Sequence, residues 1–198
     1  MAVHKLINTS GIYFITFTCH NWLSIIEDVK GYDLVYKWFD SLVARQHSIL
    51  GYVIMPNHIH LLLYYQAGRQ TLNTCIGNGK RFVAYGIVKI LKNQNRFRIL
   101  NVLRSSVTGK EKQNNKRHQV WIKSFDVKHC YSERFVFQKL QYIHRNPCTG
   151  RWRLAKTILD YPHSSARYYI SGKDTGYPVK DYRQFLRDES PLGDSSVE

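Results

Sequence analysis

The chain has 198 residues, 43% of them hydrophobic, which is enough to bury the core of one domain. It has 29 Lys and Arg residues and 14 Asp and Glu residues, which gives a formal net charge of +15. Such an excess of positive charge predicts binding to a polyanion such as nucleic acid. A membrane surface is less favoured, because no basic amphipathic helix with a long apolar face is visible. No signal peptide or membrane span is visible, so we expect a soluble intracellular protein. The four widely separated cysteines suit neither a disulfide framework nor a zinc ribbon, so we expect free thiols.

Periodic apolar residues predict a strand, a helix and a hairpin in the first third of the chain. Residues 11–20 alternate β-branched and aromatic side chains, which is the pattern of a strand. Residues 28–50 carry apolar side chains at the spacing of an amphipathic helix. Residues 51–65 predict two strands joined at Pro56 and Asn57, because proline cannot donate to a strand ladder and asparagine tolerates turn geometry.

A second helix, a basic loop and a further strand are expected in the middle of the chain. Residues 71–92 have a helical pattern. Three glycines within it indicate a bend or a close backbone approach: Gly77, Gly79 and Gly86. From residue 93 the chain becomes basic and polar, and residues 105–117 predict a mobile loop. Residues 119–125, with the sequence QVWIKSF, are a candidate strand.

A third helix completes the predicted fold. Ser132 can cap a helix that stops at Pro147. The resulting order, β-α-β-β-α-β-α, predicts an α+β fold, a ferredoxin-like or RRM-like sandwich in which helices pack on a central antiparallel sheet. We expect one domain over residues 1–184, with a basic insertion at about 93–118, followed by a disordered acidic tail over residues 185–198.

Two histidines interrupt the apolar strand that ends the predicted hairpin. His58 and His60 lie on the same face of a strand, with Cβ atoms about 7 Å apart, so their imidazoles can converge on one ion. A strand can equally carry two histidines as hydrogen-bonded residues that face solvent or a helix, and a short motif taken alone is more often structural than a metal site. The pair therefore predicts a metal site only if further ligands lie nearby.

The helix that ends at Pro147 supplies candidates for the rest of the site. Tyr142 and Asn146 are four residues apart and share one helical face, although each alone fits an ordinary core aromatic or a helix-terminal residue. Combined with the histidines, they predict that His58, His60 and Asn146 hold a divalent cation, with Mg²⁺ favoured and Mn²⁺ able to substitute. Tyr142 would then attack a phosphodiester. A tyrosyl phosphate keeps the phosphodiester character of the broken bond, so another 3′-hydroxyl can reverse the step onto a different strand.

Four motifs in this order resemble the single-tyrosine HUH transposases, especially the REP-associated tyrosine transposases encoded as single chromosomal genes. They are YVIMPNHIHLLLYY, QVWIKSF, FQKLQYIHRNP and DYPHSSARYY, and the resemblance covers roughly residues 11–170. It implies the HUH endonuclease fold, with His58 and His60 as the HUH histidines, Tyr142 as the nucleophile and Asn146 as the third ligand. After Pro147, CTGRWRLA replaces the small and apolar continuation usual in the family.

The resemblance also implies an activity. Family members bind single-stranded DNA beside an imperfect hairpin, cleave it with a divalent metal, and form a 5′-phosphotyrosine with release of a 3′-hydroxyl. We expect the same of this chain, in the bacterial cytoplasm at the nucleoid. Whether it is a monomer or a homodimer stays open, because HUH transposases place their nucleophile in the same subunit or across a dimer.

Basic residues and two rival functions complete the expectations. As a set, seven cations are candidates for phosphate contacts along a DNA hairpin, although each one alone fits a solvated surface charge. They are Lys80, Arg81, Arg96, Arg98, Arg104, Lys116 and Arg117. One rival is a non-catalytic or domesticated nucleic-acid-binding regulator on the same fold. The other is a hydrolytic metal phosphodiesterase in which Tyr142 is structural.

Overall fold

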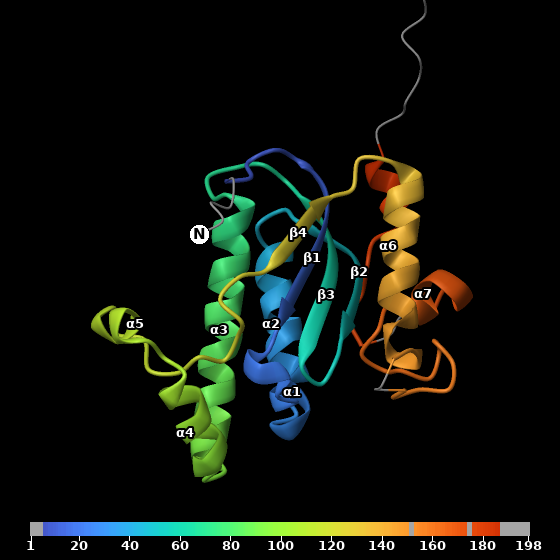
Figure 1. Ribbon diagram of the computed structural model, residues 1–198. Coiled ribbons are helices and arrows are strands. Elements are labelled where there is room, and N and C mark those ends of the chain that lie inside the picture. The colour runs from blue at the N-terminus through green and yellow to red at the C-terminus, as the bar shows by residue number, and fades with distance from the viewer. Residues whose placement is uncertain (1–5, 151–152, 174–175, 187–198) are drawn as a thin grey trace, which may run out of the picture.

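Four antiparallel strands form the central sheet of the computed structural model, which describes residues 6–150, 153–173 and 176–186 (Figure 1). They are β1 (Gly11–Thr18), β2 (Ser48–Ile54), β3 (His58–Tyr65) and β4 (Asp126–His129), in the spatial order β2-β3-β1-β4. This is the order expected of a ferredoxin-like sandwich, in which the two central strands are β1 and β3. The predicted α+β fold is confirmed.

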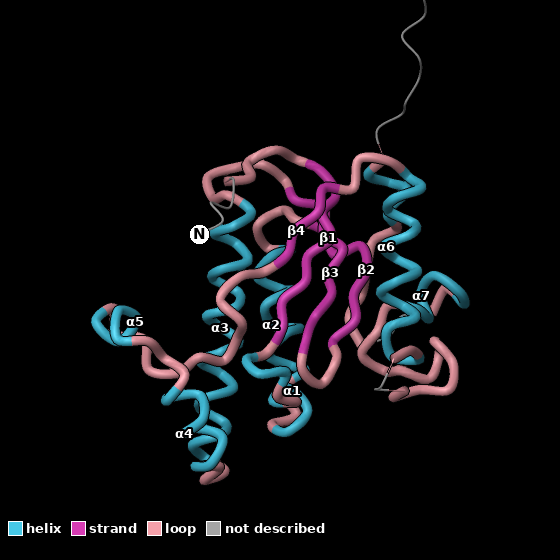
Figure 2. The backbone as a smooth tube through the Cα atoms, in the orientation of Figure 1, coloured by secondary structure: helices cyan, strands magenta, loops and turns pink. Residues whose placement is uncertain are grey.

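Helices cover both faces of the sheet (Figure 2). The helices are α1 (Ile25–Asp28), α2 (Tyr32–Val43), α3 (Leu72–Asn93), α4 (Phe97–Ser105), α5 (Gly109–Gln113), α6 (Glu133–Arg145) and α7 (Ala166–Ser171). Short 3₁₀ turns cover His20–Trp22, Asn146–Cys148 and Tyr182–Phe185. Helices α2 and α3 lie on one side of the sheet, and α6 and α7 lie on the other (Figure 1). Within the described residues no helix is both long and apolar enough to cross a bilayer.

The two faces of the sheet bury two separate cores. On β1, Ile15 and Phe17 pack toward α2 and α3, whereas Ile12 and Phe14 pack toward α6. Because both faces are covered, β3 is buried along nearly its whole length instead of alternating between core and solvent. The His58 and His60 side chains alternate with Ile59, which belongs to the α2 and α3 core, so they face α6.

Two glycines let α3 approach α2 closely, as the glycine pattern predicts. A Cβ atom on Gly86 would lie 2.6 Å from a methyl carbon of Leu34, and one on Gly79 would overlap the Trp38 ring. A Cβ atom on Gly77 would meet nothing within 4 Å, so that glycine plays no part in the approach.

The predicted helix over residues 28–50 is wrong at its C-terminal end. Helix α2 ends at Val43 because Gln46 takes a left-handed conformation (φ 67°) and the His47 N–H donates to the Leu42 carbonyl at 3.1 Å. These contacts make a Schellman-type stop. Residues 48–50 then begin β2, where the apolar side chains of Ile49 and Leu50 suit a strand as well as they would suit a helix.

The loop and the strand predicted for residues 105–125 are also corrected. Residues 109–113 form α5, whose first turn is closed by a capping box between Thr108 and Glu111. Residues 119–125 form no strand. Within this segment Trp121 makes one isolated β-bridge, to Cys19, which directly follows β1. The strand that pairs with β1 is β4, which begins at residue 126. The predicted acidic tail lies outside the described residues from residue 187 onward.

Candidate active site

Strand β3 and the end of α6 bring three potential metal ligands together. The His58 and His60 rings lie 4.8 Å apart between centroids, and both side chains are buried, at 6% and 4% exposure. Asn146 directly follows α6, and its Oδ1 lies 3.1 Å from His58 Nε2. Its Nδ2 lies 3.3 Å from His60 Nε2. Both Nε2 atoms therefore face the same amide.

Partners on the other ring nitrogens orient the two histidines. Asn57 donates through Nδ2 to the Trp22 carbonyl (3.1 Å), so its Oδ1 is the acceptor that lies 2.7 Å from His58 Nδ1. The Thr16 hydroxyl on β1 lies 2.7 Å from His60 Nδ1. Such outer contacts select the tautomer and hold a ligating imidazole in place. Each ring is thus held with Nε2 toward α6.

The two imidazoles are neutral at pH 7. Burial lowers the pKa of His58 to about 4, against a smaller opposing effect of the contact with Asn146. Burial also lowers the pKa of His60 to about 3, and the positive charges of His58 and Lys139 add to the effect. Neutral imidazole is the form that binds metal ions.

The donor set fits a divalent cation. With its proton on Nδ1 toward Asn57, neutral His58 presents a lone pair at Nε2, and Asn146 Oδ1 presents another at 3.1 Å. Two acceptors then face each other without a proton between them, which is an arrangement that a cation stabilises. Neighbouring ligands of an octahedral ion with bonds of about 2.1 Å lie about 3.0 Å apart, in agreement with this separation.

Tyr142 lies beside the histidines in the same chain. It is one helical turn before Asn146, and its ring centroid is 5.0 Å from that of His60 and 6.0 Å from that of Phe14. The Tyr142 side chain is 51% exposed, in contrast to the buried histidines, so a substrate can reach its hydroxyl. The four residues predicted from the sequence as ligands and nucleophile thus meet at one place.

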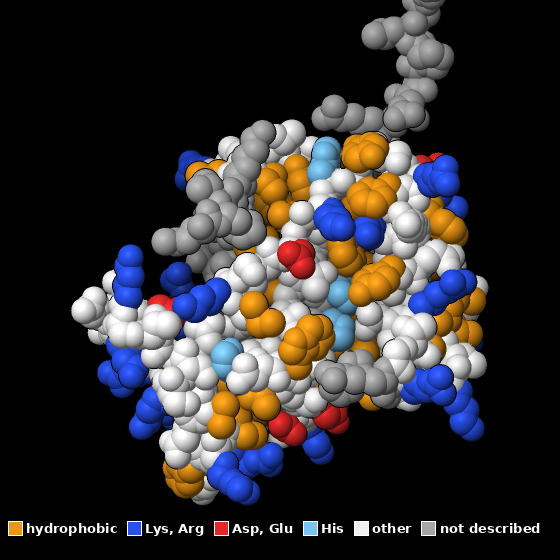
Figure 3. Space-filling view, in the orientation of Figure 1, with side chains coloured by type: hydrophobic (Ala, Val, Ile, Leu, Met, Phe, Trp, Pro, Cys, Tyr) orange, Lys and Arg blue, Asp and Glu red, His pale blue; other side chains and the backbone are white. Residues whose placement is uncertain are grey.

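These four residues line an open cleft of about 440 Å³ that also contains a carboxylate. Histidine side chains are visible near the centre of the face shown in Figure 3. Asp126 on β4 pairs with Thr16 on β1, which pairs with His60 on β3, so their side chains share one face of the sheet. Asp126 is the only acidic side chain among the described residues that line this cleft. No group of three or more His, Cys, Asp or Glu residues that could hold a metal occurs in the described part of the chain.

The sequence analysis missed Asp126 because it placed the strand one segment too early. A strand over residues 119–125 would leave residue 126 in the following loop, off the sheet. Asp126 is placed on the sheet by the pairing of β4 with β1, which sets it opposite Thr16. This pairing joins segments far apart in the sequence, so local patterns do not predict it.

Helix α6 is held in place by an N-terminal cap, by core packing and by the last of the four motifs. Ser132 caps its first turn by accepting from the Phe135 N–H at 3.3 Å, and Val136, Leu140 and Ile143 pack in the core beneath it. Near its other end, His144 Nε2 lies 3.0 Å from Ser165 Oγ, which accepts from the Tyr52 N–H on β2 at 2.9 Å. Residues 164 and 165 of the DYPHSSARYY motif therefore help to position the helix that carries Tyr142.

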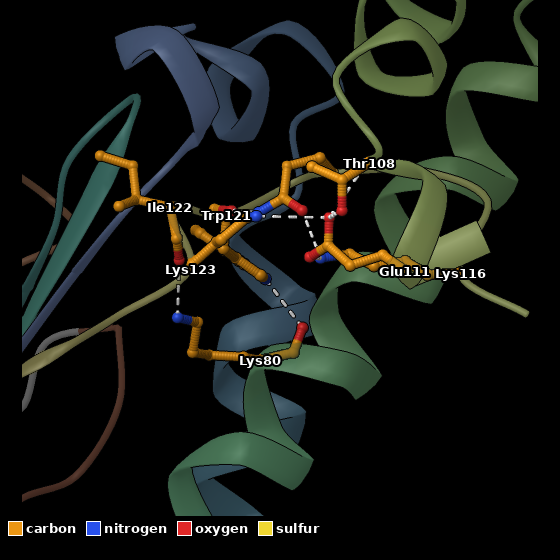
Figure 4. Close-up of polar contacts among 8 residues, drawn as sticks. Lys80, Thr108, Glu111, Lys116, Trp121, Ile122 and Lys123 are labelled. Atoms are coloured by element: carbon orange, nitrogen blue, oxygen red, sulfur yellow. Dashed lines mark hydrogen bonds and ion pairs between the residues drawn. The ribbon is translucent and has the colours of Figure 1, made fainter. Parts of the chain in front are cut away.

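The seven candidate DNA contacts are separated by the structure. Lys80, Arg81, Lys116 and Arg117 line a second hollow, between α3 and the chain that follows α5. Lys80 is only 9% exposed, and its ammonium donates to the Ile122 carbonyl at 3.0 Å (Figure 4). It also donates to the Ser124 carbonyl at 3.0 Å. Desolvation, with a smaller effect of Lys116, lowers its pKa to about 8. Lys80 therefore serves the fold. The other three candidates lie at or on α4: Arg96, Arg98 and Arg104.

Comparisons with known proteins identify the fold. The structure of a REP-associated tyrosine transposase bound to a REP hairpin superposes with a TM-score of 0.61 at 15% sequence identity, covering 94% of this chain and 98% of that one. A proposed transposase from Deinococcus radiodurans superposes with a TM-score of 0.41 at 16% identity, covering 73% and 97% of the two chains. No protein-family model matches the sequence, and no curated protein matches it. The chain has the fold of the REP-associated tyrosine transposase.

Proposed function

We propose that this protein is a metal-dependent single-stranded DNA endonuclease and strand transferase, an HUH-type tyrosine transposase that acts beside DNA hairpins. The observation that carries the proposal is the meeting of His58, His60, Asn146 and Tyr142 in one cleft of one chain. A module that only binds nucleic acid has no chemical need for all four. Because one chain supplies them all, the proposed site needs no second copy.

His58, His60 and Asn146 would hold a divalent ion, Mg²⁺ in the cell and Mn²⁺ as a substitute. When bound, the ion would supply charge neutralisation for the non-bridging phosphate oxygens. Asp126 lines the same cleft and adds a negative charge beside this neutral ligand set, which favours a hard cation. The Asn57 and Thr16 contacts keep both imidazoles aimed at this place.

Tyr142 would be the nucleophile. Its phenolic oxygen forms a bond to phosphorus, the bond from phosphorus to the 3′-oxygen breaks, and the phenolic proton is lost to water while the leaving oxygen gains one. The product is a 5′-phosphotyrosine and a free 3′-hydroxyl. Attack by another 3′-hydroxyl reverses the step and joins a different strand.

The proposed substrate is DNA that combines a hairpin with a single-stranded flank. One solved structure with this fold, that of the REP-associated tyrosine transposase, is bound to a REP hairpin, and this chain carries a net charge of +15. Blue side chains gather over α4 and α5 at the left of Figure 3, where phosphates can be held. The proposed place of action is the bacterial cytoplasm, at the nucleoid.

A covalent adduct tests this function. The full chain is incubated with single-stranded hairpin DNA and Mg²⁺ or Mn²⁺, and the products are separated on a denaturing gel. Wild type should give a protein-DNA band that needs the ion, and Tyr142→Phe should give none. Cleavage without an adduct would instead indicate a hydrolytic phosphodiesterase, and binding without cleavage would indicate a regulator.

A further inference from the structure

A basic groove lies along α3, on the helix face opposite to the one that packs against α2. We call it the α3 groove: a hollow of about 880 Å³ between the exposed face of α3 and residues 111–123. One wall is formed by Arg81, Tyr85, Val88 and Lys92, which repeat every three or four residues and so share one helical face. The other wall is the chain that leaves α5 and runs toward β4 (Figure 1).

Hydrogen bonds fix the second wall to α3. Trp121 Nε1 donates to the Lys80 carbonyl at 2.8 Å, and Lys80 Nζ donates to the Ile122 carbonyl (Figure 4). Lys80 Nζ also donates to the Ser124 carbonyl. Gln119 Nε2 in turn donates to the Trp121 carbonyl. Because these contacts join the two walls directly, the groove is preformed, and a ligand would not need to order it first.

The cations in the groove differ in how far they are already paired. Glu111 forms ion pairs with Lys116 (2.9 Å) and Lys123 (3.5 Å), so those two ammonium groups are partly neutralised. Arg81, Lys92 and Arg117 line the groove and form no ion pair within the described part of the chain. Three uncompensated cations along one hollow favour an anionic polymer.

An exposed aromatic ring makes the groove suitable for unpaired bases. The Tyr85 side chain is 71% exposed although it is large and partly apolar. Cations that follow a phosphate backbone, together with an aromatic ring on which a base can stack, are the usual means of binding single strands. A duplex hides the faces of its bases inside the stack, so it could not use Tyr85 in this way.

The α3 groove also adjoins the cleft that contains Tyr142. Ile122 lines both hollows, so they meet at this residue. We propose that the α3 groove binds the single-stranded DNA flank of the substrate and leads it into the cleft. Arg81, Lys92 and Arg117 hold phosphates, and Tyr85 stacks on a base. This inference rests on the proposed function for the identity of the strand.

Binding of a labelled oligothymidine of about 15 nucleotides, a length that such single-strand sites can cover, tests the proposal. Fluorescence anisotropy is measured in EDTA at several salt concentrations. The double variant Arg81→Gln/Arg117→Gln should reduce the slope of log K against log salt by about 1.4, because each phosphate contact to a single strand contributes about 0.7. The control Lys37→Gln/Arg69→Gln removes the same charge at exposed sites outside the groove and should leave the slope unchanged.

Tyr85 provides a second readout that net charge cannot mimic. Tyr85→Ala should weaken binding about tenfold, whereas Tyr85→Phe, which keeps the ring, should bind as wild type does. Equal losses in the groove and control double variants would overturn the proposal. So would a Tyr85→Ala protein that binds normally, a duplex of equal length that binds with the same dependence on Tyr85, or polyglutamate that competes as well as unlabelled oligothymidine.

The result is independent of the test for the covalent adduct. If the adduct forms but the groove variants bind oligothymidine normally, only the groove assignment is wrong. If binding depends on the groove but no adduct forms, only the proposed chemistry is wrong. Circular dichroism of each variant checks that the chain is folded before binding is interpreted.

Discussion

Ser165 holds the end of the nucleophile helix, and its removal should be costly. Its hydroxyl is fully buried, accepts from the Tyr52 N–H and lies 3.0 Å from His144 Nε2. In Ser165→Ala, two buried groups lose this partner, at about 1–3 kcal/mol each, so the free energy of unfolding should fall by about 2–6 kcal/mol. For a chain of this size, at about 2–4 °C per kcal/mol, this corresponds to a fall in Tm of about 4–24 °C.

Urea unfolding at pH 7 measures this change, with Ser171→Ala as a matched control. The exposed Ser171 hydroxyl donates to the Arg167 carbonyl at a helix end, so its removal should cost less than about 0.5 kcal/mol. Because His144 and Ser165 share the contact, adding Ser165→Ala to His144→Phe should cost less than adding it to wild type. A Ser165→Ala protein as stable as the control, or fully additive costs, would refute the idea that this contact anchors α6.

Three further predictions follow from the site. Burial lowers the pKa of His58 to about 4 and that of His60 to about 3, whereas both have a pKa near 6.5 in the unfolded chain. At pH 5 the unfolded chain therefore binds more protons than the folded chain does, and protonation favours unfolding. In EDTA, the urea midpoint should therefore fall from pH 7 to pH 5, and a constant or rising midpoint would contradict the buried neutral state. His60→Ala should abolish Mn²⁺ binding in a calorimetric titration, and unchanged binding would place the ion elsewhere. Asp126→Asn should weaken Mn²⁺ binding without lowering Tm, because Asp126 is exposed, whereas the exposed Asp33→Asn on α2 should leave Mn²⁺ binding unchanged.

Local periodicity was sufficient to place each pair of candidate site residues on one face of its element. His58 and His60 share a face on any strand, and Tyr142 and Asn146 share a face on any helix, so neither pair depends on distant contacts. The Ser132 cap likewise depends on one hydrogen bond within its own turn. That the two pairs would meet required the order of the elements, which the ferredoxin-like pattern supplied.

Tertiary contacts decided the elements that were predicted wrongly. The apolar run over residues 119–125 was read as a strand, but hydrogen bonds from Lys80 on α3 take the carbonyls that a strand would use in pairing. The correct strand then brings Asp126 into the cleft. The end of α2 was misplaced because apolar residues at 49 and 50 satisfy a helix and a strand equally.

Peptide mapping by mass spectrometry tests the central claim most directly. After reaction with hairpin DNA and Mn²⁺, the adduct is trimmed with nuclease, the protein is digested, and the modified peptide is sequenced. The chain has 14 tyrosines, so the attachment site distinguishes Tyr142 from many alternatives. We predict a nucleotide joined through its 5′-phosphate to Tyr142 alone, and attachment to any other residue would contradict the proposed role of the cleft.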